Sequence, residues 1–149
     1  MVGTVELRVF ETQNLSEAGA VYAACFNEPP WQDGWTNESA VQRLEALLQF
    51  PTALSQIAFL EGSLVGLAIG HVEPWVDGPH FYLSELCVSP AHRNRRVGSA
   101  LMEGLLGRLS MCGVVSVYLL TERASAAEGF FRAHDFARDS DSIKLWRQL

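Results

Sequence analysis

Cysteine is scarce in this chain of 149 residues, and the three cysteines that occur are isolated. Cys25, Cys87 and Cys112 show no CxxC spacing, and their odd number argues against a disulfide framework or a zinc site. We therefore expect no metal, and we interpret the three side chains as buried free thiols in a reducing cytoplasm.

Long apolar runs are also missing. Glu, Ser, Gly or His interrupts each run within about eight residues, far short of a membrane span. The first residues lack the basic stretch and apolar stretch of a signal peptide. No repeat, low-complexity tract or linker is present, and this length is typical of one domain with its own core. We expect a single domain over residues 1–149 and no association with a membrane.

Positive charge is absent from the middle of the chain. The net charge is −6, which disfavours a general nucleic-acid binder. Between Arg43 and Arg93 there is no Lys or Arg, but there are five acids: Glu45, Glu61, Glu73, Asp77 and Glu85. Three arginines then follow within residues 93–96. This separation predicts one region that receives a cation and another that receives an anion, which suggests two substrates.

The periodicity of apolar residues predicts alternating strands and helices. Strands are expected over residues 5–10, 54–60, 64–72, 81–88, 114–120 (buried) and 142–149. Helices are expected over 16–27, from a cap at Thr36 or Asn37 to about 50, over 99–109, and from a capping box at Ser125 to about 133. This order indicates an α+β (mixed α/β) fold with a mostly antiparallel sheet and about four flanking helices.

An arginine-rich turn joins the strand 81–88 to the helix 99–109, with the sequence Arg93-Asn94-Arg95-Arg96-Val97-Gly98-Ser99-Ala100. The first N–H groups of a helix have no partner within it, and the helix dipole is positive there. Together with three arginines, this start of a helix predicts a site for a polyanion. The alternative is a capped helix whose arginines are simply solvated.

The stretch 85–102 resembles the acetyl-CoA signature of the GNAT superfamily of N-acetyltransferases. Its pattern Q/R-x-x-G-x-G/A is matched by Arg95, Gly98 and Ala100. The stretch 127–136 is similar to the family's F-Y-x-x-x-G-F pattern, and the order of elements also agrees. The resemblance implies a GNAT-like sheet that splays at its middle strands, and an acetyl-CoA-dependent N-acetyltransferase.

The resemblance also implies which residues bind acetyl-CoA. The phosphates would lie on the loop formed by Arg93, Asn94, Arg95, Arg96, Val97, Gly98, Ser99 and Ala100. The pantetheine arm would pair, like an added strand, with the backbone of Leu86, Cys87 and Val88, after a bulge in the central strand. The N–H of Val88 would stabilise the tetrahedral oxyanion. A side chain at Gly98 would obstruct the pyrophosphate.

Glu85 is the candidate general base, because it is the one acid in an otherwise apolar strand. Strand alternation predicts that it shares a face with Leu83 and Cys87. Burial would raise its pKa and favour removal of a proton from the amine. A hydrogen-bonded structural carboxylate is the alternative role. Three nearby residues could assist or replace it: His71, Glu73 and His80.

The chain departs from the family pattern at Phe131, where the family has a tyrosine that protonates the departing thiolate. Asp135 likewise replaces a glycine. Protonation would then come from water or from another donor, such as Ser84, Tyr82 or Tyr118, or the enzyme would be weakened. The change also motivates an alternative function, a non-catalytic acyl-CoA-binding module.

The acceptor is expected beneath the connection after the first helix, as the resemblance implies. Candidate contacts are Glu28, Trp31, Asp33, Trp35 and Glu73. Aromatic faces and carboxylates attract a cationic amine, so we predict direct transfer to an aminoglycoside-like or polyamine-like molecule in a ternary complex. A lysine or N-terminal amine of a protein is the alternative. Family members are often dimers, and the predicted strand 142–149 could pair across such an interface.

Overall fold

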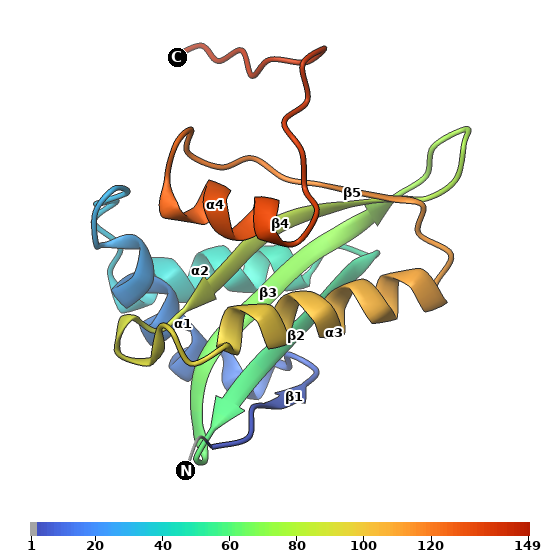
Figure 1. Ribbon diagram of the computed structural model, residues 1–149. Coiled ribbons are helices and arrows are strands. Elements are labelled where there is room, and N and C mark those ends of the chain that lie inside the picture. The colour runs from blue at the N-terminus through green and yellow to red at the C-terminus, as the bar shows by residue number, and fades with distance from the viewer. Residues whose placement is uncertain (1–2) are drawn as a thin grey trace.

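The computed structural model describes residues 3–149 and is built around one sheet (Figure 1). Its elements are β1 (Glu6–Arg8), η1 (Thr12–Asn14), α1 (Leu15–Phe26), α2 (Asn37–Leu48), β2 (Ala53–Leu60), β3 (Ser63–Glu73), β4 (His80–Val88), η2 (Pro90–His92), α3 (Val97–Met111), β5 (Ser116–Tyr118) and α4 (Ala126–Ala133). The strand order is β1-β2-β3-β4-β5, and only β4 and β5 are parallel neighbours. The predicted mixed fold with a mostly antiparallel sheet is confirmed.

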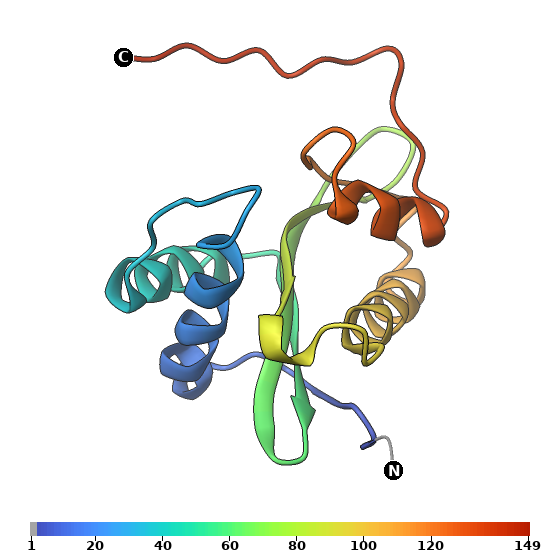
Figure 2. The ribbon, with the colours of Figure 1, turned by 60° about the vertical axis from the view of Figure 1, so that its left-hand side comes forward.

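The sheet separates two layers of helices, with α1 and α2 on one face and α3 and α4 on the other (Figure 2). One buried cluster joins α1 and α2 to the sheet and includes Leu44 and Ile57. A second joins α3 to the opposite face and includes Phe81 and Leu101. Because helices cover both faces, β2 and β3 are buried over most of their length, as their mainly apolar sequences require.

Local signals set the starts of two helices. Thr36 Oγ1 accepts a hydrogen bond from the N–H of Ser39, and Ser39 Oγ accepts one from the N–H of Thr36, both at 3.0 Å. This is a reciprocal capping box. At α4, Ser125 Oγ accepts from the N–H of Glu128 at 3.1 Å. The Glu128 carboxylate, however, accepts from the N–H of Ala124, so only half of the predicted box forms.

Strand β4 contains a bulge at Ser84. The register with β3 passes from Glu85 directly to Leu83, so Ser84 has no partner there. Cys87 consequently belongs to the core beneath α1 and α2, whereas Leu83 belongs to the core beneath α3. The predicted shared face of Leu83 and Cys87 is wrong, because one extra residue interrupts the period of two.

Strand β5 pairs with only the first part of β4. Its partners are His80–Tyr82, so Leu83–Val88 have no strand beside them on that side in the described chain. This is the splayed edge that the family resemblance implied. The prediction of a longer, buried strand over 114–120 is wrong, because β5 is an edge strand and Ser116 and Tyr118 remain exposed.

The predicted last strand does not form. Residues 137–149, which we call the tail, extend away from the body (Figures 1 and 2). Ile143 and Leu145 are 81% and 84% exposed. No backbone hydrogen bond joins residues 143–149 to the other described residues. An alternating sequence forms a strand only beside a partner strand, and the tail meets none in the part of the chain that the structure describes.

The cysteines are free thiols, and Cys25 and Cys87 are buried as predicted. Cys112 is exposed, because it caps the end of α3 outside the core. Over residues 3–149, none of the helices is long and apolar enough to cross a membrane.

Candidate active site

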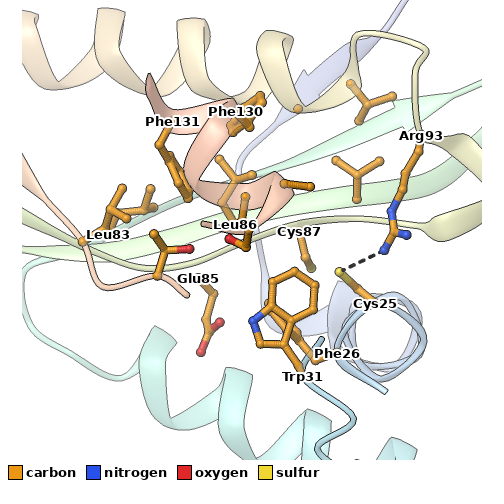
Figure 3. Close-up of a pocket in the computed structure, with 18 of the residues that line it drawn as sticks. Cys25, Phe26, Trp31, Leu83, Glu85, Leu86, Cys87, Arg93, Phe130 and Phe131 are labelled. Atoms are coloured by element: carbon orange, nitrogen blue, oxygen red, sulfur yellow. Dashed lines mark hydrogen bonds between the residues drawn. The ribbon is translucent and has the colours of Figure 1, made fainter. Parts of the chain in front are cut away.

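Two cavities meet at the splayed edge of β4. The large cavity, of about 660 Å³, follows β4 from Leu83 to Val88 into the loop before α3. The small cavity, of about 390 Å³, lies towards α1 and α2. The two share the side chains of Phe26, Trp31, Glu85 and Leu120. Figure 3 shows Glu85 and Trp31 on one side of this space and Phe130 and Phe131 on the other.

The loop that closes one end of the large cavity holds two residues in the left-handed region. Asn94 has a φ of 61° and Arg96 a φ of 62°, and α3 begins at the next residue, Val97. Left-handed residues in such a turn direct successive N–H groups into a common concavity. The first N–H groups of α3 also lack partners within the helix. This geometry suits an anion.

The three arginines of the loop have different surroundings. Arg96 lines the large cavity and forms no ion pair with the described residues. Arg95 pairs with Glu61 in the β2–β3 turn at 3.4 Å and lies outside the cavity. Arg93 pairs with Glu28 at 2.8 Å and thereby joins the loop to the α1–α2 connection. Arg96 is therefore the arginine best placed to meet an anion.

Most predicted donor-binding residues are brought to the large cavity: Leu86, Cys87, Val88, Arg93, Asn94, Arg96, Val97, Gly98 and Ser99. Arg95 and Ala100 do not line it.

Gly98 has a packing role that the sequence did not reveal. A Cβ there would lie 3.2 Å from the ring of Phe130, so glycine allows α4 to approach α3.

Aromatic and charged side chains line the small cavity. Its lining residues are Tyr22, Phe26, Trp31, Asp33, Trp35, Arg43, Glu85 and Leu120. Tyr22 meets Trp35 edge-on with ring centroids 5.1 Å apart. Trp35 Nε1 donates to Asp33 at 3.1 Å. The predicted Trp31, Asp33 and Trp35 are thus brought together with Glu85. Tyr22, Phe26 and Arg43 were missed, because helical spacing did not distinguish them from ordinary core or surface positions.

Two predicted acceptor contacts lie elsewhere. Glu28 is paired with Arg93, and Glu73 accepts a hydrogen bond from the hydroxyl of Tyr118 at 2.6 Å. Neither side chain lines the two cavities.

His71 stacks on a phenylalanine ring near Glu73, and His80 pairs with an aspartate. The structure therefore leaves Glu85 as the one predicted base at the junction.

Only one carboxylate oxygen of Glu85 accepts hydrogen bonds from the described residues. Its Oε1 accepts hydrogen bonds from the hydroxyl of Tyr22 at 3.0 Å and from Nη2 of Arg43 at 3.1 Å. Its Oε2 accepts none from the side chains and backbone described in residues 3–149. Burial raises the pKa of Glu85, and the bonds from Arg43 and Tyr22 act against that rise. One oxygen is thus fixed and the other is free to take a proton.

A model of the Acetyltransferase (GNAT) family matches residues 17–136. The chain belongs to the GNAT family and is an acetyltransferase. No curated protein matches the sequence.

Solved structures share the GNAT fold over 97–98% of the chain. An aminoglycoside acetyltransferase from an uncultured soil metagenomic sample, in complex with sisomicin, is 16% identical, with a TM-score of 0.75 and coverage of 97% of this chain and 96% of that chain. An aminoglycoside N-acetyltransferase in complex with CoA is 16% identical, with a TM-score of 0.75 and coverage of 98% and 95%. The ribosomal-protein-alanine N-acetyltransferase of Brucella melitensis biovar Abortus 2308 is 18% identical, with a TM-score of 0.76 and coverage of 97% and 100%.

Phe131 places a phenyl ring in the wall of the large cavity, where this GNAT chain lacks the family's tyrosine hydroxyl. Of the other candidate proton donors, Ser84 lines the same cavity. Tyr82 and Tyr118 pack against each other, with ring centroids 4.9 Å apart, and line neither cavity. The bulge at Ser84 therefore brings a hydroxyl to the cavity that holds Phe131.

Cys25 forms part of the same wall, beside Cys87 and Arg93 (Figure 3). Nη2 of Arg93 donates to its sulfur at 3.9 Å. The pKa of Cys25 is lowered by the thiol of Cys87 and, to a smaller extent, by Arg93 and the N–H of Val88. Burial acts in the opposite direction and raises it. The interaction with Cys25 and burial raise the pKa of Cys87. Cys25 is thus the thiol of the pair that ionises first.

Proposed function

We propose that this GNAT acetyltransferase moves the acetyl group of acetyl-CoA to a primary amine of a small cationic molecule. The observation that carries the proposal is the meeting of two cavities at Glu85. Molecules bound in the two cavities would touch there, so transfer needs no covalent enzyme intermediate. The acceptor amine would lie beside a carboxylate with one free oxygen.

The residues that line the large cavity suit coenzyme A chemically. The free backbone edge of Leu86–Val88 can pair with an extended pantetheine arm. The N–H groups of the loop before α3 and the charge of Arg96 suit its phosphates. When bound, acetyl-CoA supplies an activated thioester. The N–H of Val88 is our candidate for stabilising the oxyanion that forms on attack.

The small cavity favours a cationic acceptor. Trp31 and Trp35 line it, and indole rings attract cations; Asp33 adds a carboxylate. Arg43 offsets the charge of Glu85, to which it is bonded. Asp33 and the aromatic faces therefore provide most of the attraction for a second positive group on the acceptor. This arrangement is consistent with an aminoglycoside-like or polyamine-like compound.

The chain supplies two proton-transfer groups. Oε2 of Glu85 would accept a proton from the amine, directly or through one water, so that a neutral amine attacks the thioester. The hydroxyl of Ser84 would donate to the departing thiolate. A thiolate leaves readily, so this second transfer contributes less than the first.

The test measures thiol release from acetyl-CoA with a panel of amines: an aminoglycoside, a polyamine and a peptide with a free N-terminus. We expect release with the first two and little with the peptide. Release with the peptide alone would favour a protein acetyltransferase. Binding of acetyl-CoA without release for any amine would favour an acyl-CoA-binding module.

A further inference from the structure

Two cysteines from different elements meet in the wall of the large cavity. Cys25 lies in the last turn of α1 and Cys87 lies near the end of β4, and both line that cavity. Figure 3 shows the two side chains pointing toward one another, with Arg93 reaching the sulfur of Cys25. Acetyl transfer by direct attack uses neither thiol, so it leaves this pair of sulfurs without a role.

Cys25 is the member of the pair that can act as a nucleophile. The thiol of Cys87 donates to its sulfur, and Nη2 of Arg93 donates to it at 3.9 Å. These contacts lower the pKa of Cys25 to about 7, although burial acts against them. A large fraction of Cys25 is therefore thiolate near neutral pH, and the thiolate is the form that attacks a disulfide. Cys87 stays protonated, because its interaction with Cys25 and burial raise its pKa.

The large cavity controls access to this thiolate. Only 5% of the surface of Cys25 is exposed, and the residue lines the cavity. A disulfide reagent therefore reaches the sulfur from within the cavity, so that fit to the cavity and thiolate character together decide which reagent reacts. Cys112 provides the contrast, because it is exposed at the end of α3 and open to any disulfide.

The sulfur of Cys25 lies where the thiol end of coenzyme A is expected. The backbone N–H of Val88 interacts with this sulfur and contributes to its lowered pKa. The same N–H is our candidate for stabilising the oxyanion of the thioester, so the sulfur of bound coenzyme A would lie beside Cys25. The phosphates would be held at the loop that carries Arg96, which lines the same cavity. A ligand bound in this way presents its sulfur to a protein thiolate.

We propose that Cys25 is a modification site, at which coenzyme A disulfide bound in the large cavity forms a mixed disulfide with the protein. This site rests on the proposed function, because coenzyme A must first bind in that cavity. The thiolate of Cys25 attacks one sulfur of the ligand, so that a bond forms between Sγ and that sulfur. The S–S bond of the ligand breaks, and the other coenzyme A leaves as a thiolate. The ligand is the oxidant, and the tethered coenzyme A would then exclude acetyl-CoA from the cavity.

The test treats the reduced Cys112→Ser variant with coenzyme A disulfide or with glutathione disulfide and follows its intact mass. We expect one coenzyme A to be added, and peptide mass spectrometry should place it on Cys25. This addition should be roughly tenfold or more faster than addition of glutathione, because the cavity positions only the former ligand. Saturating acetyl-CoA should slow it. Dithiothreitol should remove the added mass and restore binding of acetyl-CoA, which calorimetric titration measures.

Two further variants, made in the same Cys112→Ser protein, separate the roles of the two thiols. Cys25→Ser should gain no coenzyme A, because the attacking sulfur is lost. Cys87→Ala should still gain it, but the pH at which the rate is half-maximal should rise, because the thiol that lowers the pKa of Cys25 is removed. An unchanged pH profile in Cys87→Ala would contradict the pairing of the two thiols.

Three results would overturn the assignment of Cys25. The first is equal rates for the two disulfides, and the second is no modification of Cys25 by either. The third is a disulfide between Cys25 and Cys87, seen as a loss of two hydrogens, with no coenzyme A adduct. In each case, binding of acetyl-CoA by the untreated protein would leave the proposed function standing. An untreated protein that binds no acetyl-CoA would instead overturn the proposed function, and the modification site with it.

Discussion

Tyr22 donates its hydroxyl hydrogen to Oε1 of Glu85 at 3.0 Å and so ties α1 to β4 where the two cavities meet. Burial and the charge of Glu85 raise the pKa of Tyr22, so the phenol remains a donor over the working pH range. With Arg43 it occupies one carboxylate oxygen and leaves the other available. The position of Glu85 is therefore set by long-range contacts to two helices.

Replacing Glu85 with Gln keeps the shape of the side chain and removes the base. We expect kcat to fall by on the order of a hundredfold or more. In the parent, activity is lost as pH falls through the pKa of Glu85, which burial raises. This acid limb of kcat/KM should vanish in Glu85→Gln, and an unchanged pH profile would remove Glu85 from the mechanism.

Replacing Tyr22 with Phe should shift the acid limb without abolishing activity. The hydroxyl stabilises the charged form of Glu85 and thereby lowers its pKa. Its loss raises that pKa further, so the limb moves to higher pH while the plateau in kcat is kept. Tyr82→Phe is the control, because Tyr82 lines neither cavity. Equal behaviour of the two variants would contradict the account.

Arg96 and Arg95 provide a test variant and its control for the acetyl-CoA site. Arg96 lines the large cavity, whereas Arg95 pairs with Glu61 outside it. A hydrogen bond to a charged group contributes about 1.5–3 kcal/mol, so Arg96→Ala should weaken acetyl-CoA binding by roughly tenfold or more. Arg95→Ala should change it little. Calorimetric titration measures the acetyl-CoA affinity of both variants. A larger loss of affinity in Arg95→Ala than in Arg96→Ala would refute the assignment of Arg96 to the phosphates.

Ser84 should be the proton donor that replaces the missing tyrosine. Ser84→Ala is expected to lower kcat by about tenfold, less than a general acid commonly contributes, because thiolates leave readily. Tyr118→Phe should have no such effect, since Tyr118 is bonded to Glu73 away from the cavities. The measurement is kcat of both variants at saturating substrate concentrations. Full activity in Ser84→Ala would leave water as the proton donor.

Cys25 should react with iodoacetamide at a lower pH than an ordinary thiol, because its neighbours lower its pKa. Acetyl-CoA should protect it, since Cys25 lines the large cavity. Peptide mass spectrometry follows the labelling, with the exposed Cys112 as an internal control that acetyl-CoA leaves unprotected. Equal labelling of Cys25 with and without acetyl-CoA would place the donor elsewhere.

Features that depend on neighbours in the sequence were predicted well. The cap at Thr36 and the helix from Ser125 both rest on contacts between residues a few positions apart. Such contacts leave a pattern that can be seen in the chain alone. The same holds for the hairpin of β2 and β3, whose turn is short.

Features that depend on distant partners were missed. The resemblance implied a bulge in the central strand, but its position at Ser84 is defined only by the register with β3, and no residue type in β4 indicates it. Arg43 reaches Glu85 across 42 positions, and Glu28 meets Arg93 across 65. The strand predicted over 142–149 has the right alternation but no neighbouring strand among residues 3–149, since a strand forms only beside a partner.

The most direct measurement follows CoA release from acetyl-CoA by the parent and by Glu85→Gln, with and without a small cationic amine. We predict release that requires the amine in the parent and is lost in the variant, while both proteins still bind acetyl-CoA. Release that is independent of the amine, or equal in the two proteins, would contradict transfer at the junction of the cavities.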